Sequence, residues 1–148
     1  MSETAFYADI FTHSFDEKGR ITVPSEWREP HFEQHLVVVP SGENFLQIFP
    51  ASFMGRMLDK LKQKETSPDQ RAQIQNLAAS SHAAKFDAQG RIVIKEHLRI
   101  RAGLPLKAKA SVVFVGVADH FQMFEKSEWE KRQFKPTDYK ATENKVGP

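Results

Sequence analysis

One ten-residue stretch occurs twice in this chain of 148 residues, and this repetition limits the possible folds more than any other feature of the sequence. Residues 15–24 read FDEKGRITVP, and residues 86–95, 71 positions later, read FDAQGRIVIK. The likeness resumes at a shift of 75 in two short apolar segments: 37–38 matching 112–113, and 47–49 matching 122–124. A self-match of this length indicates an internal duplication, so the fold is expected to consist of two similar halves.

The repeated stretch has the residues of a tight turn between two strands. Asp16 and Asp87 begin the two turns, because an aspartate side chain accepts hydrogen bonds from backbone N–H groups of its own turn. Gly19 and Gly90 end them, because glycine adopts the left-handed conformation without a Cβ penalty. β-Branched residues follow each turn. A β-hairpin is therefore expected in each half, and turn geometry alone accounts for these four residues.

Eight short strands and several helices are expected, which places the chain in the α+β class. The strands are expected to pair in sequence order as four hairpins: 10–15 with 21–23, 36–39 with 45–49, 83–86 with 91–94, and 112–117 with 121–124. Each half is too small to bury its own apolar faces. The eight strands are therefore expected to close into one β-barrel with pseudo-twofold symmetry and peripheral helices.

The duplication divides the chain into four segments. The first repeat spans residues 7–51 and the second spans residues 82–134. Between them, residues 52–81 carry apolar side chains at helical spacing and the sequence Ser67-Pro68-Asp69-Gln70, which predict a helical hairpin whose second helix begins with a capping box. Residues 135–148 are polar and are expected to form a disordered tail.

The composition excludes several classes of protein. The formal net charge is only +2, so any binding of nucleic acid requires local clustering of basic residues or several copies of the chain. The chain has no cysteine, which excludes disulfide and thiolate chemistry and fits a reducing cytosol. No apolar run is long enough for a transmembrane helix, and the N-terminus has no secretory signal pattern. A cytoplasmic location without membrane contact is expected.

No enzyme class is indicated by the sequence. The G-x-S-x-G, Walker and glycine-rich dinucleotide motifs are absent. His31 and His35 have the i, i+4 spacing of a helical metal pair, but a structural zinc site has four ligands and no further ligand is evident. We therefore expect no catalytic residue, no metal, no cofactor and no small-molecule substrate.

Turn chemistry does not account for Arg20 and Arg91, which follow the two glycines and have two interpretations. Each guanidinium could contact phosphates or base edges of DNA. Alternatively, each could pair with Asp16 or Asp87 and brace its turn. Both interpretations hold together if the aspartate orients the arginine.

Other basic residues also have two interpretations. Lys60, Lys62 and Lys64 could contact phosphates, or they could form the solvated face of a helix. Arg28 and Arg99 could contact phosphates, or their stems could cover apolar surface.

Residues 16–24, DEKGRITVP, resemble the AbrB-like swapped-hairpin motif. The double copy of this motif resembles the MraZ family specifically, as do Ala102-Gly103-Leu104 and residues 115–124. The likeness extends from about residue 7 to about residue 129, which is nearly the whole chain. This resemblance implies a duplicated swapped-hairpin AbrB-like barrel.

The resemblance also implies a function. It implies a bacterial, nucleoid-associated transcriptional regulator that binds double-stranded DNA at short direct repeats near its own division and cell-wall operon. It further implies a homo-oligomeric ring. Carried over by position, the DNA-binding residues are Lys18 and Arg20 in the first motif and Arg91 in the second, where Gln89 stands in place of the lysine.

The sequence departs from the family pattern at several positions. Asp9 stands where the family commonly has glycine, Lys95 replaces the proline of the second motif, and Ala72 and Gln75 replace basic residues on the linking helix. The operator sequence and the ring size therefore stay open. An alternative function is a ring-forming scaffold that binds another protein, and steep salt dependence of DNA binding would distinguish the regulator from it.

Overall fold

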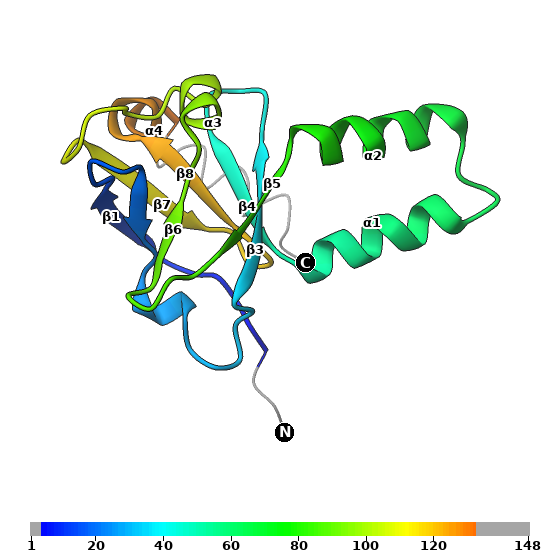
Figure 1. Cartoon of the computed structure of the whole chain (residues 1–148), viewed down its shortest axis with the longest axis horizontal. Helices are drawn as coiled ribbons and strands as arrows, with labels where there is room; N and C mark the ends of the chain where they lie inside the picture. The colour runs from blue at the N-terminus through cyan, green and yellow to red at the C-terminus, as the bar shows by residue number, and fades with distance from the viewer. Residues whose placement is uncertain (1–3, 133–148) are drawn as a thin grey trace, which may run out of the picture.

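The computed structural model describes residues 4–132 and confirms the α+β class (Figure 1). The first repeat contains β1 (Ile10–Ser14), β2 (Arg20–Thr22), the 3-10 helix η1 (Ser25–Trp27), β3 (His35–Pro40) and β4 (Leu46–Pro50). The linking segment contains α1 (Ser52–Lys62) and α2 (Pro68–Ser80). The second repeat contains β5 (His82–Lys85), β6 (Arg91–Val93), α3 (Glu96–Arg101), β7 (Ser111–Gly116), β8 (Phe121–Glu125) and α4 (Lys126–Arg132). The predicted tail at residues 135–148 lies outside the described residues.

Two of the four expected hairpins are confirmed, and the other two are wrong. β3 pairs with β4 and β7 pairs with β8, as expected. β1 and β2 do not pair with each other. Instead β1 pairs with β7 and β2 pairs with β6, while β5 pairs with β3. The turn between β1 and β2 is closed by a hydrogen bond from Asp16 N to Arg20 O, and beyond it the two strands separate to partners in the other repeat.

The strands do not close into the expected barrel through hydrogen bonds. Six of them form an antiparallel sheet in the order β1-β7-β8-β4-β3-β5, and β2 and β6 form a separate two-stranded ribbon. Because β2 and β6 pair with each other, β1 and β5 are left as the two edges of the larger sheet. The prediction of a closed barrel is therefore corrected to an open sheet with a ribbon across one face.

The strand pairings have pseudo-twofold symmetry. The strands that correspond in the two repeats are β1 and β5, β3 and β7, and β4 and β8. When the two members of each pair are exchanged, the strand order of the sheet reads as its own reverse. Ile21 of β2 pairs with Ile92 of β6, and Gln47 of β4 pairs with Gln122 of β8, so each of these residues lies opposite its own counterpart. The pseudo-twofold axis therefore passes between the two isoleucines and between the two glutamines.

The register corrects one detail of the duplication. β4 and β8 correspond at the expected shift of 75, because Gln47 lies opposite Gln122. Pro50 of β4 and Glu125 of β8 are counterparts at this shift. Leu36 of β3 lies opposite Pro50 and Val112 of β7 lies opposite Glu125, so β3 and β7 correspond at a shift of 76. The β3–β4 connection is one residue longer than the β7–β8 connection, which accounts for the difference.

The core lies between the ribbon and the larger sheet. Ile21 and Ile92 point inward from the ribbon and are 1% exposed. Trp27 of η1 is 2% exposed, packs edge-on against Tyr7, Phe11 and Phe114, and donates from Nε1 to the carbonyl of Ala8. The opposite face of the sheet is covered by α4, where a second apolar cluster contains Phe45, Val113, Val115 and Phe124, with Trp129 packed against it. The ribbon and α4 therefore lie on opposite faces of the sheet.

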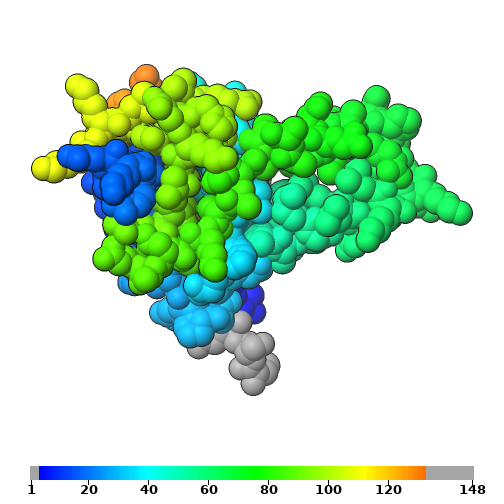
Figure 2. Space-filling model, viewed as in Figure 1, coloured from blue at the N-terminus to red at the C-terminus, as the bar shows by residue number. Residues whose placement is uncertain are grey.

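The helices α1 and α2 form an arm that projects from the body (Figures 1 and 2). The predicted capping box of α2 is confirmed: Ser67 Oγ accepts from Gln70 N, and the Gln70 side chain accepts from Ser67 N. α2 has no buried residue, while α1 buries Met57. Among residues 4–132, no helix has the length and hydropathy needed to span a membrane.

The N-terminal segment before β1 is bound to the β7–β8 connection. Tyr7 and Ala118 exchange two backbone hydrogen bonds of 2.8 Å, and Gly116 N donates to Asp9 O at 2.9 Å. Asp9 has a φ of +81°, in the left-handed region that favours glycine. This conformation agrees with the glycine that the resemblance leads one to expect at this position. In this chain, Asp9 Oδ1 accepts a hydrogen bond from Ile10 N.

Candidate nucleic-acid interface

The two repeated turns have the same hydrogen bonds. In the first, Asp16 Oδ1 accepts from the backbone N–H groups of Lys18 and Arg20 at 2.9 Å, and Asp16 Oδ2 accepts from Arg20 Nε at 2.6 Å. In the second, Asp87 receives the equivalent bonds from Gln89 N, Arg91 N and Arg91 Nε. Gly19 and Gly90 have φ values of +73° and +77°, so the expected left-handed conformation is confirmed in both turns.

The aspartates therefore brace the turns and orient the arginines at the same time. The carboxylate of each turn accepts a hydrogen bond from Nε of its arginine. Arg20 and Arg91 are 30% and 25% exposed in their side chains. Of the two open interpretations, the ion pair with aspartate is present, and it holds the guanidinium at the surface.

The ribbon brings the two turns together. β2 and β6 are antiparallel, with Arg20 opposite Val93 and Thr22 opposite Arg91, so the two arginines lie diagonally across the ribbon. Arg91 Nη1 lies 3.8 Å from Asp16 Oδ2 of the other repeat. The two aspartates and two arginines thus form one connected charged cluster, which we call the ribbon cluster: Asp16, Arg20, Asp87 and Arg91.

Hydrogen bonding lowers the pKa of both aspartates in the ribbon cluster. For Asp16 the main cause is the hydrogen bond from the Arg20 backbone N–H, followed by the Arg20 side chain and the Lys18 N–H. For Asp87 the corresponding donors are Arg91 and Gln89. All these donors favour the charged form of the carboxylate.

We expect the two aspartates to make stability depend on acid pH. A carboxyl with a lowered folded pKa contributes stability that is present above its unfolded pKa, about 4, and is lost as the pH falls through the folded value. The free energy of unfolding should therefore fall below about pH 4. Urea denaturation of the wild type and of a double variant, Asp16→Asn with Asp87→Asn, would measure this. An equally steep acid loss in the double variant would contradict the expectation.

Each turn is also held by an arginine whose contacts cross between the repeats. Arg28 Nε donates to Val23 O at 2.8 Å, and its guanidinium lies over Gly90 of the second turn, whose carbonyl accepts from Val23 N. Arg99 Nε correspondingly donates to Ile94 O at 3.0 Å and lies over Gly19, whose carbonyl accepts from Ile94 N. These contacts give Arg28 and Arg99 a bracing role in the two turns.

Only part of this arrangement was predictable from the sequence. The duplication identified Asp16, Gly19, Asp87 and Gly90 as turn residues and Arg20 and Arg91 as a candidate pair. The crossing contacts of Arg28 and Arg99 were missed, although both arginines recur in register, eight residues after Arg20 and Arg91. Lys18 is exposed, and its backbone N–H rather than its ammonium takes part in the first turn.

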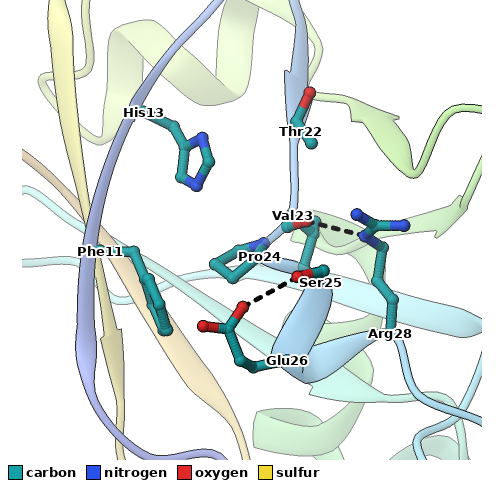
Figure 3. A pocket seen from close by; sticks show the side chains of 8 residues that line it. All are labelled: Phe11, His13, Thr22, Val23, Pro24, Ser25, Glu26 and Arg28. Carbon is teal, nitrogen blue, oxygen red and sulfur yellow. Dashed lines mark hydrogen bonds between the residues drawn. The ribbon is translucent and has the colours of Figure 1, made fainter.

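A hollow of about 320 Å³ adjoins one end of the ribbon (Figure 3). Phe11 and His13 of β1 face Glu26 and Arg28 across it, and Thr22 of the ribbon lies at its rim. Burial lowers the pKa of His13, while the nearby Glu26 acts in the opposite direction. The remaining residues that line the hollow are Val23, Pro24 and Ser25.

The histidine spacing noted in the sequence is not a helical pair. His35 is the first residue of β3, and His31 precedes it in the connection after η1, where its Nδ1 lies 4.0 Å from Glu29 Oε2. Within residues 4–132, no three acidic, histidine or cysteine side chains are grouped so that they could hold a metal ion.

Comparison with known proteins identifies the family. The model of the family described as "MraZ protein, putative antitoxin-like" matches this chain twice, at residues 6–76 and 77–144, which supports the duplication. A protein of Corynebacterium urealyticum, named transcriptional regulator MraZ, is 34% identical over 82% of each chain. Proteins of the same name from Corynebacterium jeikeium and Pediococcus pentosaceus are 33% and 32% identical, over 80% and 82% of each chain. The chain therefore belongs to the MraZ family.

Proposed function

We propose that this protein is a sequence-specific, DNA-binding transcriptional regulator that contacts duplex DNA with the two repeated turns. The observation that carries the proposal is the ribbon cluster, in which arginines from the two repeats are held together, each by its own aspartate at Nε and with Arg91 Nη1 3.8 Å from Asp16 Oδ2. A guanidinium held at its Nε by a carboxylate is pre-oriented for phosphate oxygens or for O6 and N7 of guanine. Lys18 supplies a further exposed cation beside Arg20.

The relatives support this proposal, because the similar proteins carry the name transcriptional regulator. We further propose a homo-oligomeric ring that binds short direct repeats near the protein's own division and cell-wall operon, in the cytoplasm and associated with the nucleoid. A ring would repeat the modest positive charge of one subunit along the duplex, so weak contacts would add through avidity. The exchange of strand partners between the repeats supports a swapped-hairpin relationship to AbrB-like proteins.

The proposal is tested by DNA binding of Arg20→Ala across a salt series. Fluorescence anisotropy would compare duplex DNA from upstream of the protein's own operon with a scrambled duplex of the same length. The wild type is expected to prefer the operon DNA and to bind more weakly as salt rises, because neutralised phosphates release counterions. Loss of one base or phosphate contact per subunit should weaken binding by about 1–3 kcal/mol, roughly 5- to 150-fold.

Lys131→Ala provides the matched control. Lys131 is an exposed cation on α4, on the sheet face away from the ribbon, so this change removes one charge without touching the ribbon cluster. Its effect on binding should be small. Equal weakening by Arg20→Ala and Lys131→Ala would contradict the placement of the site. No preference of the wild type for operon DNA would contradict the regulator and favour the scaffold that binds a protein.

A further inference from the structure

The outer face of the ribbon carries two residues that the proposed function does not use. Ile21 and Ile92 point into the core, so the alternation of a strand places their neighbours on the outer face. These neighbours are Arg20 and Thr22 on β2 and Arg91 and Val93 on β6, which form a two-by-two array. The arginines occupy one diagonal of the array, and Thr22 and Val93 occupy the other.

Val93 is an exposed apolar residue in this array. Its side chain is 48% exposed, while the equally β-branched Ile92 beside it is buried. Its cross-strand partner is Arg20, a cation whose Nε is already bound to Asp16. This half-exposed valine is therefore a small apolar surface that neighbours Arg20 across the ribbon and Arg91 along β6.

The size and charge of this face fit the major groove of duplex DNA. The two strands of a ribbon lie about 4.8 Å apart and two residues span about 6.6 Å, so the Cα atoms of the diagonal arginines are about 8 Å apart, on the order of two base-pair steps of about 3.4 Å. The major groove is about 12 Å wide and admits a two-stranded β-ribbon. Arg28 and Arg99, which cover the two turn glycines, add positive charge beside the ribbon.

We propose that the outer face of the β2–β6 ribbon lies in the major groove and that Val93 contacts the C5-methyl group of a thymine. Apolar side chains recognise this methyl group, and thymine alone presents it in the groove. Thr22, which occupies the symmetry-related position, offers a hydroxyl instead and can bond to a base edge. The inference rests on the proposed function, since it names the base-reading part of the same surface.

The pairing of Thr22 with Val93 has a consequence for binding direction. The arginines of the ribbon cluster are related by the pseudo-twofold axis. If only these arginines contacted the bases, the protein would bind a duplex site equally well in either of its two orientations. Thr22 and Val93 are counterparts in the two repeats but differ in chemistry. The face therefore distinguishes the two directions of a DNA site.

The inference is tested by replacing thymine with deoxyuridine, which removes only the methyl group. The best-bound operon duplex would be prepared with deoxyuridine at each thymine in turn and titrated by anisotropy. Wild-type protein is expected to bind at least one substituted duplex about fourfold more weakly, as for the loss of one buried methyl group. Val93→Ser should bind the unmodified duplex more weakly and should not respond to the same substitution.

Ile100→Ser is the matched control, because Ile100 on α3 is 59% exposed and lies outside the ribbon. This variant should keep the wild-type response to deoxyuridine. The inference is overturned if Val93→Ser responds to deoxyuridine as the wild type does. It is also overturned if Val93→Ser changes the oligomeric state and leaves DNA binding unchanged, because the face would then contact another copy of the chain. Failure of the wild type to bind DNA at all would instead overturn the proposed function.

Discussion

Replacing Gly116 with alanine is expected to lower the free energy of unfolding by about 2–4 kcal/mol, because the new methyl group has no space. A Cβ at Gly116 would lie 2.6 Å from both Ala8 N and the carbonyl carbon of Tyr7. These are backbone atoms that cannot rotate away. The segment before β1 would have to leave the sheet, which would break its hydrogen bonds to Ala118 and expose the buried ring of Tyr7.

Gly55→Ala is the control for this prediction and should have the opposite sign. Gly55 lies within α1, and a Cβ there would meet no atom within 4 Å. Alanine in a helix is more favourable than glycine by up to about 1 kcal/mol, so this variant should be slightly more stable. Urea denaturation of the two variants would measure both changes. A Gly116→Ala variant as stable as the wild type would show that the N-terminal segment does not dock as described.

Replacing Gly90 with alanine is expected to cost about 2–3 kcal/mol, from backbone strain together with the hydrogen bond that the displaced Arg28 side chain gives up. Gly90 has a φ of +77°, and a Cβ there would lie 2.7 Å from Nε of Arg28 and would also overlap its guanidinium carbon. Relief of the clash requires Arg28 to release Val23 O. Gly42→Ala separates the two costs, because Gly42 has a φ of +83° and open space around it. It should cost only the strain, about 1–2 kcal/mol.

A double-mutant cycle would show whether Arg28 causes the larger cost of Gly90→Ala compared with Gly42→Ala. When Arg28→Ala is already present, Gly90→Ala should cost no more than Gly42→Ala, because the guanidinium is absent. An unchanged cost in that background would show that Arg28 does not constrain the second turn. In NMR spectra, Arg28→Ala is also expected to shift the backbone amide signal of Gly90 more than that of Gly19.

Local features of the fold were predictable from the sequence, and long-range pairings were not. The turns at Asp16 and Asp87, the β3–β4 and β7–β8 hairpins and the capping box at Ser67 depend on residues close together in the chain. The partner of β1 is β7, about 100 residues later, and no local pattern distinguishes it from β2. Assigning β2 as the partner of β1 produced the wrong hairpin, and closing the strands in that order produced the barrel that the structure does not have.

The same limit applies to the candidate site. Turn chemistry predicted the aspartate and glycine of each turn, and the duplication marked the arginines. The contact of Arg28 with Gly90 and that of Arg99 with Gly19 join residues of different repeats, so the spacing within one repeat could not reveal them. The left-handed conformation of Asp9 was missed for a different reason, since it depends on the backbone bond from Gly116 N to Asp9 O, which joins the N-terminal segment to a distant strand.

The exchange of strands between repeats also governs when the protein can fold during synthesis. The first repeat leaves the ribosome as β1 to β4, but β1, β2 and the free edges of β3 and β4 all pair with strands of the second repeat. The emerging half therefore has only the β3–β4 hairpin as a complete pairing of its own. A nascent chain that stops before β7 and β8 holds unsatisfied strand edges, which are sites for aggregation or for chaperone binding. The sheet described for residues 4–132 is thus completed only when β8 has been made.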